Sequence, residues 1–199
     1  MTAPSQPDQS DLFGSDEPAP QPAAEAGRQS LFYALIPPPA VTEQVVALTA
    51  ELRARHGLKG KPLLPQHLHV TLVSAADLPD GMPPEYIEAA QAAAASMRHP
   101  PLDVVFDRAL SFPNGAFVLS GAGSAGVHSY ARLLRESLKR FGLKPEPASA
   151  PHMTLLYGRQ RVDEHAIEPV RWTAASFSLV LSHVGKKQHD PLGAWPLRS

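Results

Sequence analysis

A four-residue pattern occurs twice in this chain and constrains its fold more than any other feature. Residues 69–72 and 152–155 both have the order His, apolar residue, Thr, Leu. Successive side chains of a β-strand point to opposite faces. Each segment therefore predicts a strand with His and Thr on one face and apolar residues on the other. Because the copies lie in different halves of the chain, they indicate two similar halves that each contribute one strand to a shared centre.

The polar residues of the two patterns are the candidate functional residues: His69, Thr71, His152 and Thr154. Imidazole has an unperturbed pKa of about 6.5, so one histidine can be neutral while the other is protonated near neutral pH. Such a pair can act as base and acid. There are simpler explanations, because a single strand histidine is more often structural and threonine favours strands through its β-branched side chain. The repetition favours a shared site.

A metal site is the main competitor for paired histidines, because imidazole is a common metal ligand. Such a site needs carboxylates or a third histidine at ligand spacing, and neither pattern contains an acidic residue. The chain has no cysteine, which excludes disulfides, thiolate metal ligands and a cysteine nucleophile. The sequence therefore predicts a site that uses no metal and no other cofactor.

Length and composition indicate a soluble protein. A chain of 199 residues with 43% hydrophobic residues suits one globular domain or two small lobes that share a core. No run approaches the roughly 18 apolar residues of a membrane helix. The N-terminus lacks a basic segment followed by an apolar one, which argues against a secretory signal. We therefore expect a cytoplasmic protein without membrane contact.

The first residues differ in composition from the rest. Five of the 19 acidic residues and none of the 18 basic residues lie within 1–27, among many Pro, Ser, Gln and Ala. Such a segment cannot bury enough apolar surface to fold. We expect an acidic, Pro-rich disordered tail at 1–29 and a folded domain at 30–199. The folded part is mildly basic, which suits a polyanionic ligand but does not by itself indicate nucleic acid.

Hydrophobic periodicity divides the folded part into strands and helices. The predicted strands are 30–36, 67–72, 102–106, 116–119, 152–157 and 172–183, and the predicted helices are 41–56, 86–97 and 127–141. The last helix has one apolar stripe, which runs from Val127 to Phe141. Residues 189–197 are expected to return along the surface. This mixture indicates an α+β fold in which helices back antiparallel sheets.

The doubled His-x-Thr-Leu pattern resembles the two motifs of the 2H phosphoesterases. The nearest branch is the bacterial 2′-5′ RNA ligase / RNA 2′,3′-cyclic phosphodiesterase group. The resemblance extends to the opening strand at 31–37, the lead-in to the first motif at 65–68, the approach to the second motif at 142–151, and the closing segments 176–182 and 195–197. It covers about residues 30–199.

This resemblance implies a bilobal, pseudo-two-fold fold in which two antiparallel sheets line a central cleft and the helices lie outside. It implies that His69 and His152 act as acid and base without a metal, and that Thr71 and Thr154 bind the phosphoryl oxygens. The implied partner is RNA or a nucleotide with a 2′,3′-cyclic phosphate end, which is hydrolysed to a 2′-phosphate. Joining of RNA ends through a 2′-5′ linkage is a further implied activity, and a monomer is expected.

The resemblance breaks down at the rim of the implied pocket. Relatives of this branch usually carry Arg five residues after the second motif's His; here that residue is Tyr157, and the nearest Arg is Arg159. After the first motif this chain has 73–75 as Val-Ser-Ala, where relatives often have Phe-Leu-Gly. Tyr157, Arg159 and Phe32 remain candidate substrate-binding residues, because an aromatic ring can stack on a base and Arg can bind phosphate.

Further candidates and two alternative functions stay open. The basic loop 59–62 and the cluster of His183, His189 and Lys186-Lys187 are candidate phosphate contacts, although both are also typical of solvated turns. His69 is assigned as the acid and His152 as the base, an assignment that depends on the orientation of the substrate. The alternatives are an enzyme for a small cyclic nucleotide and an RNA-binding module that performs no chemistry.

Overall fold

The computed structural model describes residues 27–147, 150–186 and 188–198. The strands are β1 (Gln29–Leu35), β2 (Val70–Leu78), β3 (Leu102–Ser111), β4 (Ala116–Ser120), β5 (His152–Tyr157), β6 (His165–Ala174), β7 (Ser176–His183) and β8 (Gln188–Pro196). The helices are α1 (Pro39–His56), α2 (Pro84–Ala95) and α3 (Ala125–Arg140), with 3-10 turns η1 (Pro65–His67) and η2 (Ala122–Ser124). Most of the predicted tail lies outside the described residues, and β1 begins at Gln29, one residue before the predicted boundary.

The two strands that carry the repeated pattern are neighbours at the centre of the sheet. The strand order is β6-β3-β4-β5-β2-β1-β7-β8, and the neighbouring strands are antiparallel. Strands β2 and β5 are joined by a single residue pair, Val70 with Met153. Each side of this junction therefore forms a half-sheet that belongs to one lobe. The predicted α+β class and paired antiparallel arrangement are confirmed, with the two sheets continuous through one residue pair.

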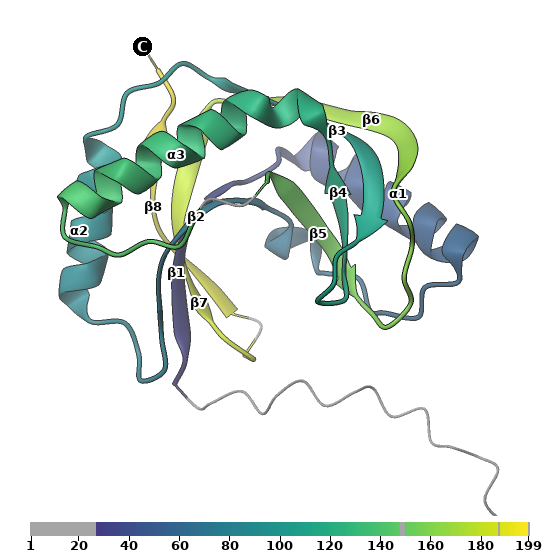
Figure 1. Ribbon diagram of the computed structural model, residues 1–199, viewed down its shortest axis with the longest axis horizontal. Coiled ribbons are helices and arrows are strands. Elements are labelled where there is room, and N and C mark those ends of the chain that lie inside the picture. Colours follow the sequence, from purple (N-terminus) through teal and green to yellow (C-terminus); the bar gives the residue numbers. More distant parts are fainter. Residues whose placement is uncertain (1–26, 148–149, 187, 199) are drawn as a thin grey trace, which may run out of the picture.

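Each half contains a strand, a helix and a patterned strand, in the orders β1-α1-β2 and β4-α3-β5. The helices, however, pack on the opposite lobe. Helix α1 contacts β6 of the β4–β5 half, and α3 contacts β2 and α2 of the β1–β2 half. Figure 1 shows α2 and α3 over one half-sheet and α1 beside β3 and β6. This exchange of helices ties the lobes into one unit and holds β2 against β5.

The main core lies between each half-sheet and its helices. On α3 the predicted apolar stripe is buried at Val127, Tyr130, Leu134 and Leu138. Its last predicted member, Phe141, is 42% exposed, so that part of the prediction is wrong. The helix ends at Arg140, and Gly142 follows with a φ of 85°, which turns the chain out of the helical path before the stripe is complete.

The predicted long strand at 172–183 is instead the junction of two strands. Strand β6 ends at Ala174 and β7 begins at Ser176, so at Ala175 the chain passes from the outer strand of one half-sheet into the other half-sheet. This junction contains no Gly or Pro, which is why the alternating pattern continues through it. The final segment forms edge strand β8, where Pro191 is tolerated because the outer edge needs no backbone donor. No helix of the described chain is both long and apolar enough to cross a membrane.

Candidate active site

The junction of β2 and β5 brings the four predicted polar residues onto one face. Val70 and Met153, which pair with each other, are fully buried. Alternation then directs the preceding and following side chains to the opposite face. Continuing the antiparallel register by one residue in each direction sets His69 opposite Thr154 and Thr71 opposite His152. His69 itself lies just before β2, and His67 is in η1, so the predicted strand starts too early.

The leucine of the first pattern lies in a β-bulge. Strand β1 pairs with Thr71 and Val73 but leaves Leu72 without a partner. A bulge shifts the alternation of side chains by one residue, and Leu72 and Val73 are both buried. The next residue, Ser74, pairs with Phe32 and therefore lies on the same face as Thr71.

The second pattern has a bulge at the same position. Strand β4 pairs with Thr154 and Leu156 but leaves Leu155 without a partner, and both leucines are buried. Tyr157 is 52% exposed and lies on the face of His152 and Thr154. Strict alternation would have turned Tyr157 into the core. The two bulges explain why the Leu of each pattern is followed by a second buried apolar residue, and they add Tyr157 to the cleft face.

Backbone carbonyl groups hold both histidines in the same tautomer. The Nδ1 atom of His69 lies 2.7 Å from the carbonyl oxygen of His67, and Nδ1 of His152 lies 2.9 Å from that of Ala150. A carbonyl oxygen only accepts hydrogen bonds, so Nδ1 of each neutral ring carries the proton. The Nε2 atom of each ring is then available to take up a proton or, once protonated, to donate one.

His69 is packed more closely than His152. Its ring centroid lies 5.0 Å from that of Phe32 and 5.9 Å from that of His189. Burial is the main cause that lowers the pKa of His69, to about 4 in all; the positive charges of His189, His152 and His67 also lower it, and the hydrogen bond from Nδ1 raises it. His69 is therefore neutral near pH 7. The effect of His152 indicates that the two imidazoles lie within electrostatic range of each other.

A second phenylalanine packs against His152. The ring of Phe112 lies 5.0 Å from that of His152, edge to face. Arg161 fixes this turn by donating hydrogen bonds to the carbonyl oxygens of Phe112 and Pro113, at 2.7 and 2.9 Å. Each lobe thus supplies a histidine with its Nδ1 bound to backbone and an aromatic ring against its imidazole.

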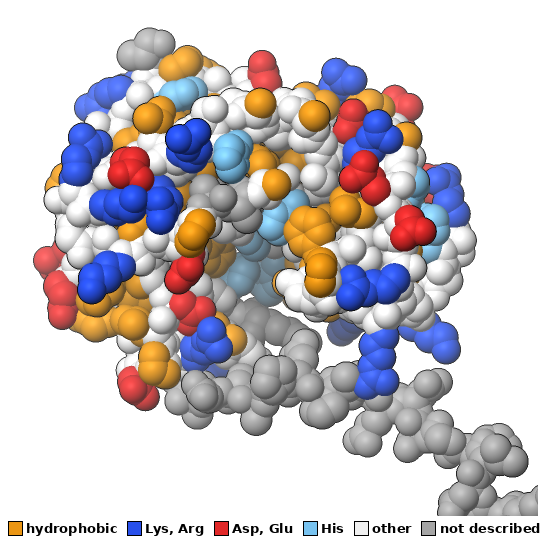
Figure 2. Space-filling view, viewed as in Figure 1, with side chains coloured by type: hydrophobic (Ala, Val, Ile, Leu, Met, Phe, Trp, Pro, Cys, Tyr) orange, Lys and Arg blue, Asp and Glu red, His pale blue; other side chains and the backbone are white. Residues whose placement is uncertain are grey.

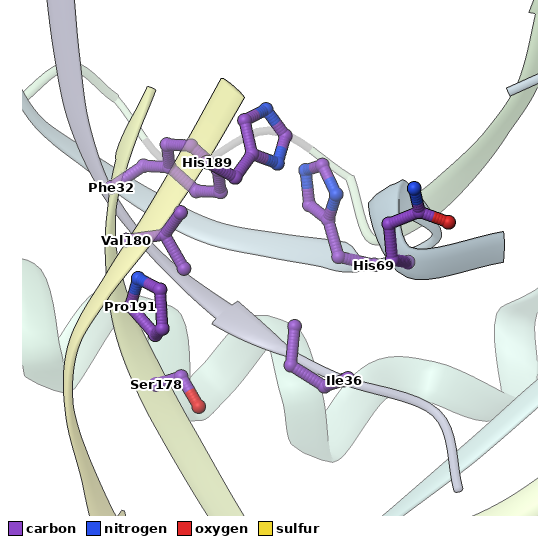
Figure 3. A pocket seen from close by; sticks show the side chains of 8 residues that line it. Phe32, Ile36, His69, Ser178, Val180, His189 and Pro191 are labelled. Atoms are coloured by element: carbon purple, nitrogen blue, oxygen red, sulfur yellow. The ribbon is translucent and has the colours of Figure 1, made fainter. Parts of the chain in front are cut away.

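A cavity of about 190 Å³ opens beside His69. Its lining residues are Phe32, Ile36, Gln66, His69, Ser178, Val180, His189 and Pro191. The lining combines apolar side chains with Gln66, Ser178 and two histidines, and none of the lining residues is a carboxylate. Figure 2 shows histidine side chains gathered in a hollow at the centre of the molecule. In the close-up, His189 and His69 approach each other from β8 and from the segment before β2 (Figure 3).

The remaining predicted contacts are separated. Phe32 lies in the cavity, whereas Tyr157 lies at the far end of β5 and Arg159 is exposed beyond it. Gly60, in the predicted basic loop, packs against the backbone of Tyr157, so Lys59 and Lys61 lie near that end of the cleft.

The predicted histidine cluster near the C-terminus does not form one surface. His183 Nε2 is 2.7 Å from an Asp190 carboxylate oxygen, and its Nδ1 is 3.2 Å from Gln29 Nε2. His189 instead lines the cavity, Lys186 is exposed, and Lys187 lies outside the described residues. Sequence reasoning missed Gln66, Ser178 and Phe112, which have no local signal because they come from a turn, from β7 and from the approach to β4.

The arrangement offers proton transfer and anion binding by neutral and cationic imidazoles. In the part of the chain that the structure describes, no group of three or more His, Asp or Glu is arranged to hold a metal ion. The hydroxyl groups of Thr71 and Thr154 lie on the same face as the imidazoles and supply hydrogen-bond donors.

Known structures share this fold. E. coli LigT in complex with ATP is 23% identical, with a TM-score of 0.68 over 86% of this chain and 99% of that chain. The Thermus thermophilus protein TT0787 is also 23% identical, with a TM-score of 0.68 over 85% of this chain and 98% of that chain. The MHV ns2 PDE domain is 18% identical, with a TM-score of 0.51 over 79% of this chain and 99% of that chain. No curated protein sequence matches the chain.

A family model provides the sequence-level link. The model described as the 2′-5′ RNA ligase superfamily matches residues 37–186. This range includes most of the described chain and both His-x-Thr-Leu patterns. The chain therefore belongs to the 2′-5′ RNA ligase superfamily, whose members are 2H phosphoesterases.

Proposed function

We propose that this protein is an RNA 2′,3′-cyclic phosphodiesterase that opens cyclic phosphate ends to 2′-phosphates by two-histidine acid–base catalysis. One observation carries the proposal. Two structurally equivalent histidines, one from each lobe, are held in the same tautomer on the cleft face of adjacent strands. A phosphate between them would have a base on one side and an acid on the other, as in-line displacement requires.

The burial of His69 supports its role as the base. In the unliganded protein the pKa of His69 is about 4, so its Nε2 is free to accept a proton from water. The negative charge of a bound phosphodiester raises the pKa of a neighbouring imidazole, which strengthens the base once substrate is bound. This assignment reverses the one made from sequence, where burial could not be seen.

In the proposed reaction one histidine takes up a proton and the other gives one. Nε2 of His69 takes a proton from water as the water oxygen attacks phosphorus. The bond from phosphorus to the ribose 3′ oxygen breaks, and Nε2–H of His152 protonates that oxygen. The phosphate remains on the 2′ oxygen, and exchange with solvent resets both histidines. A 5′-hydroxyl of a second RNA end in place of water would give a 2′-5′ linkage by the same steps.

The other cleft-face residues would bind the substrate. The hydroxyl groups of Thr71 and Thr154 can donate to the non-bridging phosphoryl oxygens, where charge redistributes during the reaction. Phe32, which lines the cavity, offers an aromatic surface for the terminal base. Tyr157, with Lys59 and Lys61 nearby, can contact the RNA backbone at the far end of β5. We place Arg159 in this outer group of contacts.

Product identification tests the proposal. The purified protein is incubated with a short RNA that ends in a 2′,3′-cyclic phosphate, in the presence of EDTA, and the product is identified by phosphorus NMR. We expect complete conversion to the 2′-phosphate, at a rate that EDTA does not change. A 3′-phosphate product, or activity that EDTA abolishes, would contradict the proposed chemistry. Binding without turnover would favour the RNA-binding alternative.

A further inference from the structure

A pair of histidines beside the catalytic centre has no role in the reaction described above. The rings of His67 and His189 lie 4.6 Å apart, with an angle of 36° between their planes. His67 comes from η1 and His189 from β8, so elements far apart in the sequence bring them together. The His189 ring also meets Phe32 at 5.8 Å and His69 at 5.9 Å, edge to face in both cases.

Both members of this pair lie next to His69: the ring of His189 is 5.9 Å from that of His69, and the backbone oxygen of His67 is 2.7 Å from Nδ1 of His69. The charges of both His189 and His152 act on His69. The charged groups that shift the pKa of His189 are instead His67 and Asp190. The His67–His189 pair therefore adjoins His69, one of the two histidines between which the reacting phosphate is proposed to bind. An anion bound at the pair would lie next to the reacting phosphate without replacing it.

The surroundings of the pair favour an anion. None of the residues that line the adjacent cavity is a carboxylate. The nearest acid in sequence, Asp190, accepts hydrogen bonds from His183 at 2.7 Å and from Gln188 at 3.0 Å. Two positive charges on these neighbouring rings would repel each other, and a bound anion offsets that repulsion. Even a neutral imidazole still presents one N–H donor to an oxygen.

We propose that His67 and His189 bind the internucleotide phosphate that precedes the cyclic end of the substrate. This inference rests on the proposed function, which puts the terminal phosphate between His69 and His152 and the terminal base over Phe32. The 5′ phosphate of that same nucleotide then lies one ribose away, on the His189 side. A cyclic mononucleotide lacks this group. The substrate class is therefore an RNA oligonucleotide end rather than a free cyclic nucleotide.

The contact has a definite pH dependence. The titratable groups around His189 are His67 from η1, His69 from the segment before β2, and Asp190 and His183 from the β7–β8 hairpin; Phe32 from β1 is uncharged. Burial lowers the pKa of His189, His67 lowers it further and Asp190 raises it. His189 consequently becomes cationic only at a pH below the usual titration range of histidine. The preference for an internucleotide phosphate should therefore increase as the pH falls from 7.5 to 5.5.

A binding experiment that needs no turnover tests this inference. Two dinucleotides that end in a 2′-phosphate are compared by calorimetric titration at pH 5.5 and 7.5. One has a normal internucleotide phosphate, and the other has an uncharged methylphosphonate at that position. At pH 5.5 we expect the dinucleotide with the charged phosphate to bind about tenfold more tightly than the methylphosphonate, which corresponds to about 1.4 kcal/mol. At pH 7.5 this ratio of affinities should be smaller.

Three variants test whether His189 causes the difference in affinity between the two ligands. His189→Gln should reduce the affinity ratio to about one at both pH values, and His189→Phe, which retains an aromatic ring against His67, should do the same. His183→Gln is the matched control on the same hairpin, because His183 is bound to Asp190 outside the cavity; it should retain the wild-type ratio. Thermal unfolding of each variant shows whether the fold is intact.

The outcomes separate this inference from the proposed function. A ratio near one in the wild-type protein, or a ratio that His189→Gln leaves unchanged, overturns the inference. If the protein still hydrolyses cyclic ends in that case, the proposed function remains supported although the phosphate contact is not. A pH-dependent ratio that is lost in both His189 variants supports the phosphate contact even if the cyclic ends are not hydrolysed.

Discussion

Replacing His152 with Ala is expected to lower kcat/KM for a cyclic RNA end by about 10²–10⁴, the usual contribution of a positioned acid or base. His69→Ala should cause a loss of similar size. The two groups act on the same transition state, so the double variant should lose much less than the product of the single losses. Initial rates with a 2′,3′-cyclic RNA end give all three values.

His99→Ala is the matched control for these variants. Nδ1 of His99 lies 2.7 Å from the carbonyl oxygen of Pro100, a backbone contact like those of His69 and His152, but His99 lies outside the cleft lining. It should retain the wild-type rate. Circular dichroism checks that each variant is folded. Full activity of either His69→Ala or His152→Ala would remove the basis of two-histidine catalysis.

Gly60→Ala is expected to destabilise the protein by about 1–3 kcal/mol, the usual cost of forcing atoms into a packed position. A Cβ at residue 60 would overlap the carbonyl oxygen of Tyr157 and lie 2.9 Å from Cδ1 of Leu156. The backbone oxygen cannot rotate away, so the loop must separate from β5. Urea unfolding measures the loss of stability, and the KM for an RNA end should rise because Tyr157 and the neighbouring lysines move.

Gly126→Ala provides the opposite case in the same protein. Gly126 lies in α3, and an added Cβ would meet no atom within 4 Å. Alanine in a helix is favoured over glycine by roughly 0.5–1 kcal/mol, so this variant should be slightly more stable than wild type. If the Gly60→Ala protein is as stable as the Gly126→Ala protein, the result contradicts the close packing of residues 59–61 against β5.

The sequence predicts which residues share the central face because side-chain alternation is a local property of strands. It identifies His69, Thr71, His152 and Thr154 as one set, and the pairing of Val70 with Met153 explains why they meet. Most helix and strand ranges also follow from local periodicity. The family resemblance is confirmed by the family model and by the shared fold.

Features that depend on distant partners could not be predicted in this way. The bulges at Leu72 and Leu155 exist only relative to β1 and β4, and they decide that Tyr157 faces the cleft. The exchange of α1 and α3 between lobes is invisible to any local pattern. The proposal that His69 is the base rests on its burial, to which Phe32 and His189 contribute from other strands.

A substrate with a bridging sulfur tests the central claim most directly. In a 2′,3′-cyclic phosphate whose 3′ oxygen is replaced by sulfur, the leaving group departs as a thiolate and needs no general acid. We predict that His152→Ala hydrolyses this substrate at close to the wild-type rate, whereas His69→Ala remains inactive because it lacks the base. Rescue of His69→Ala alone would reverse the two roles. Equal rates for wild type and both variants on the oxygen and sulfur substrates would contradict two-histidine catalysis altogether.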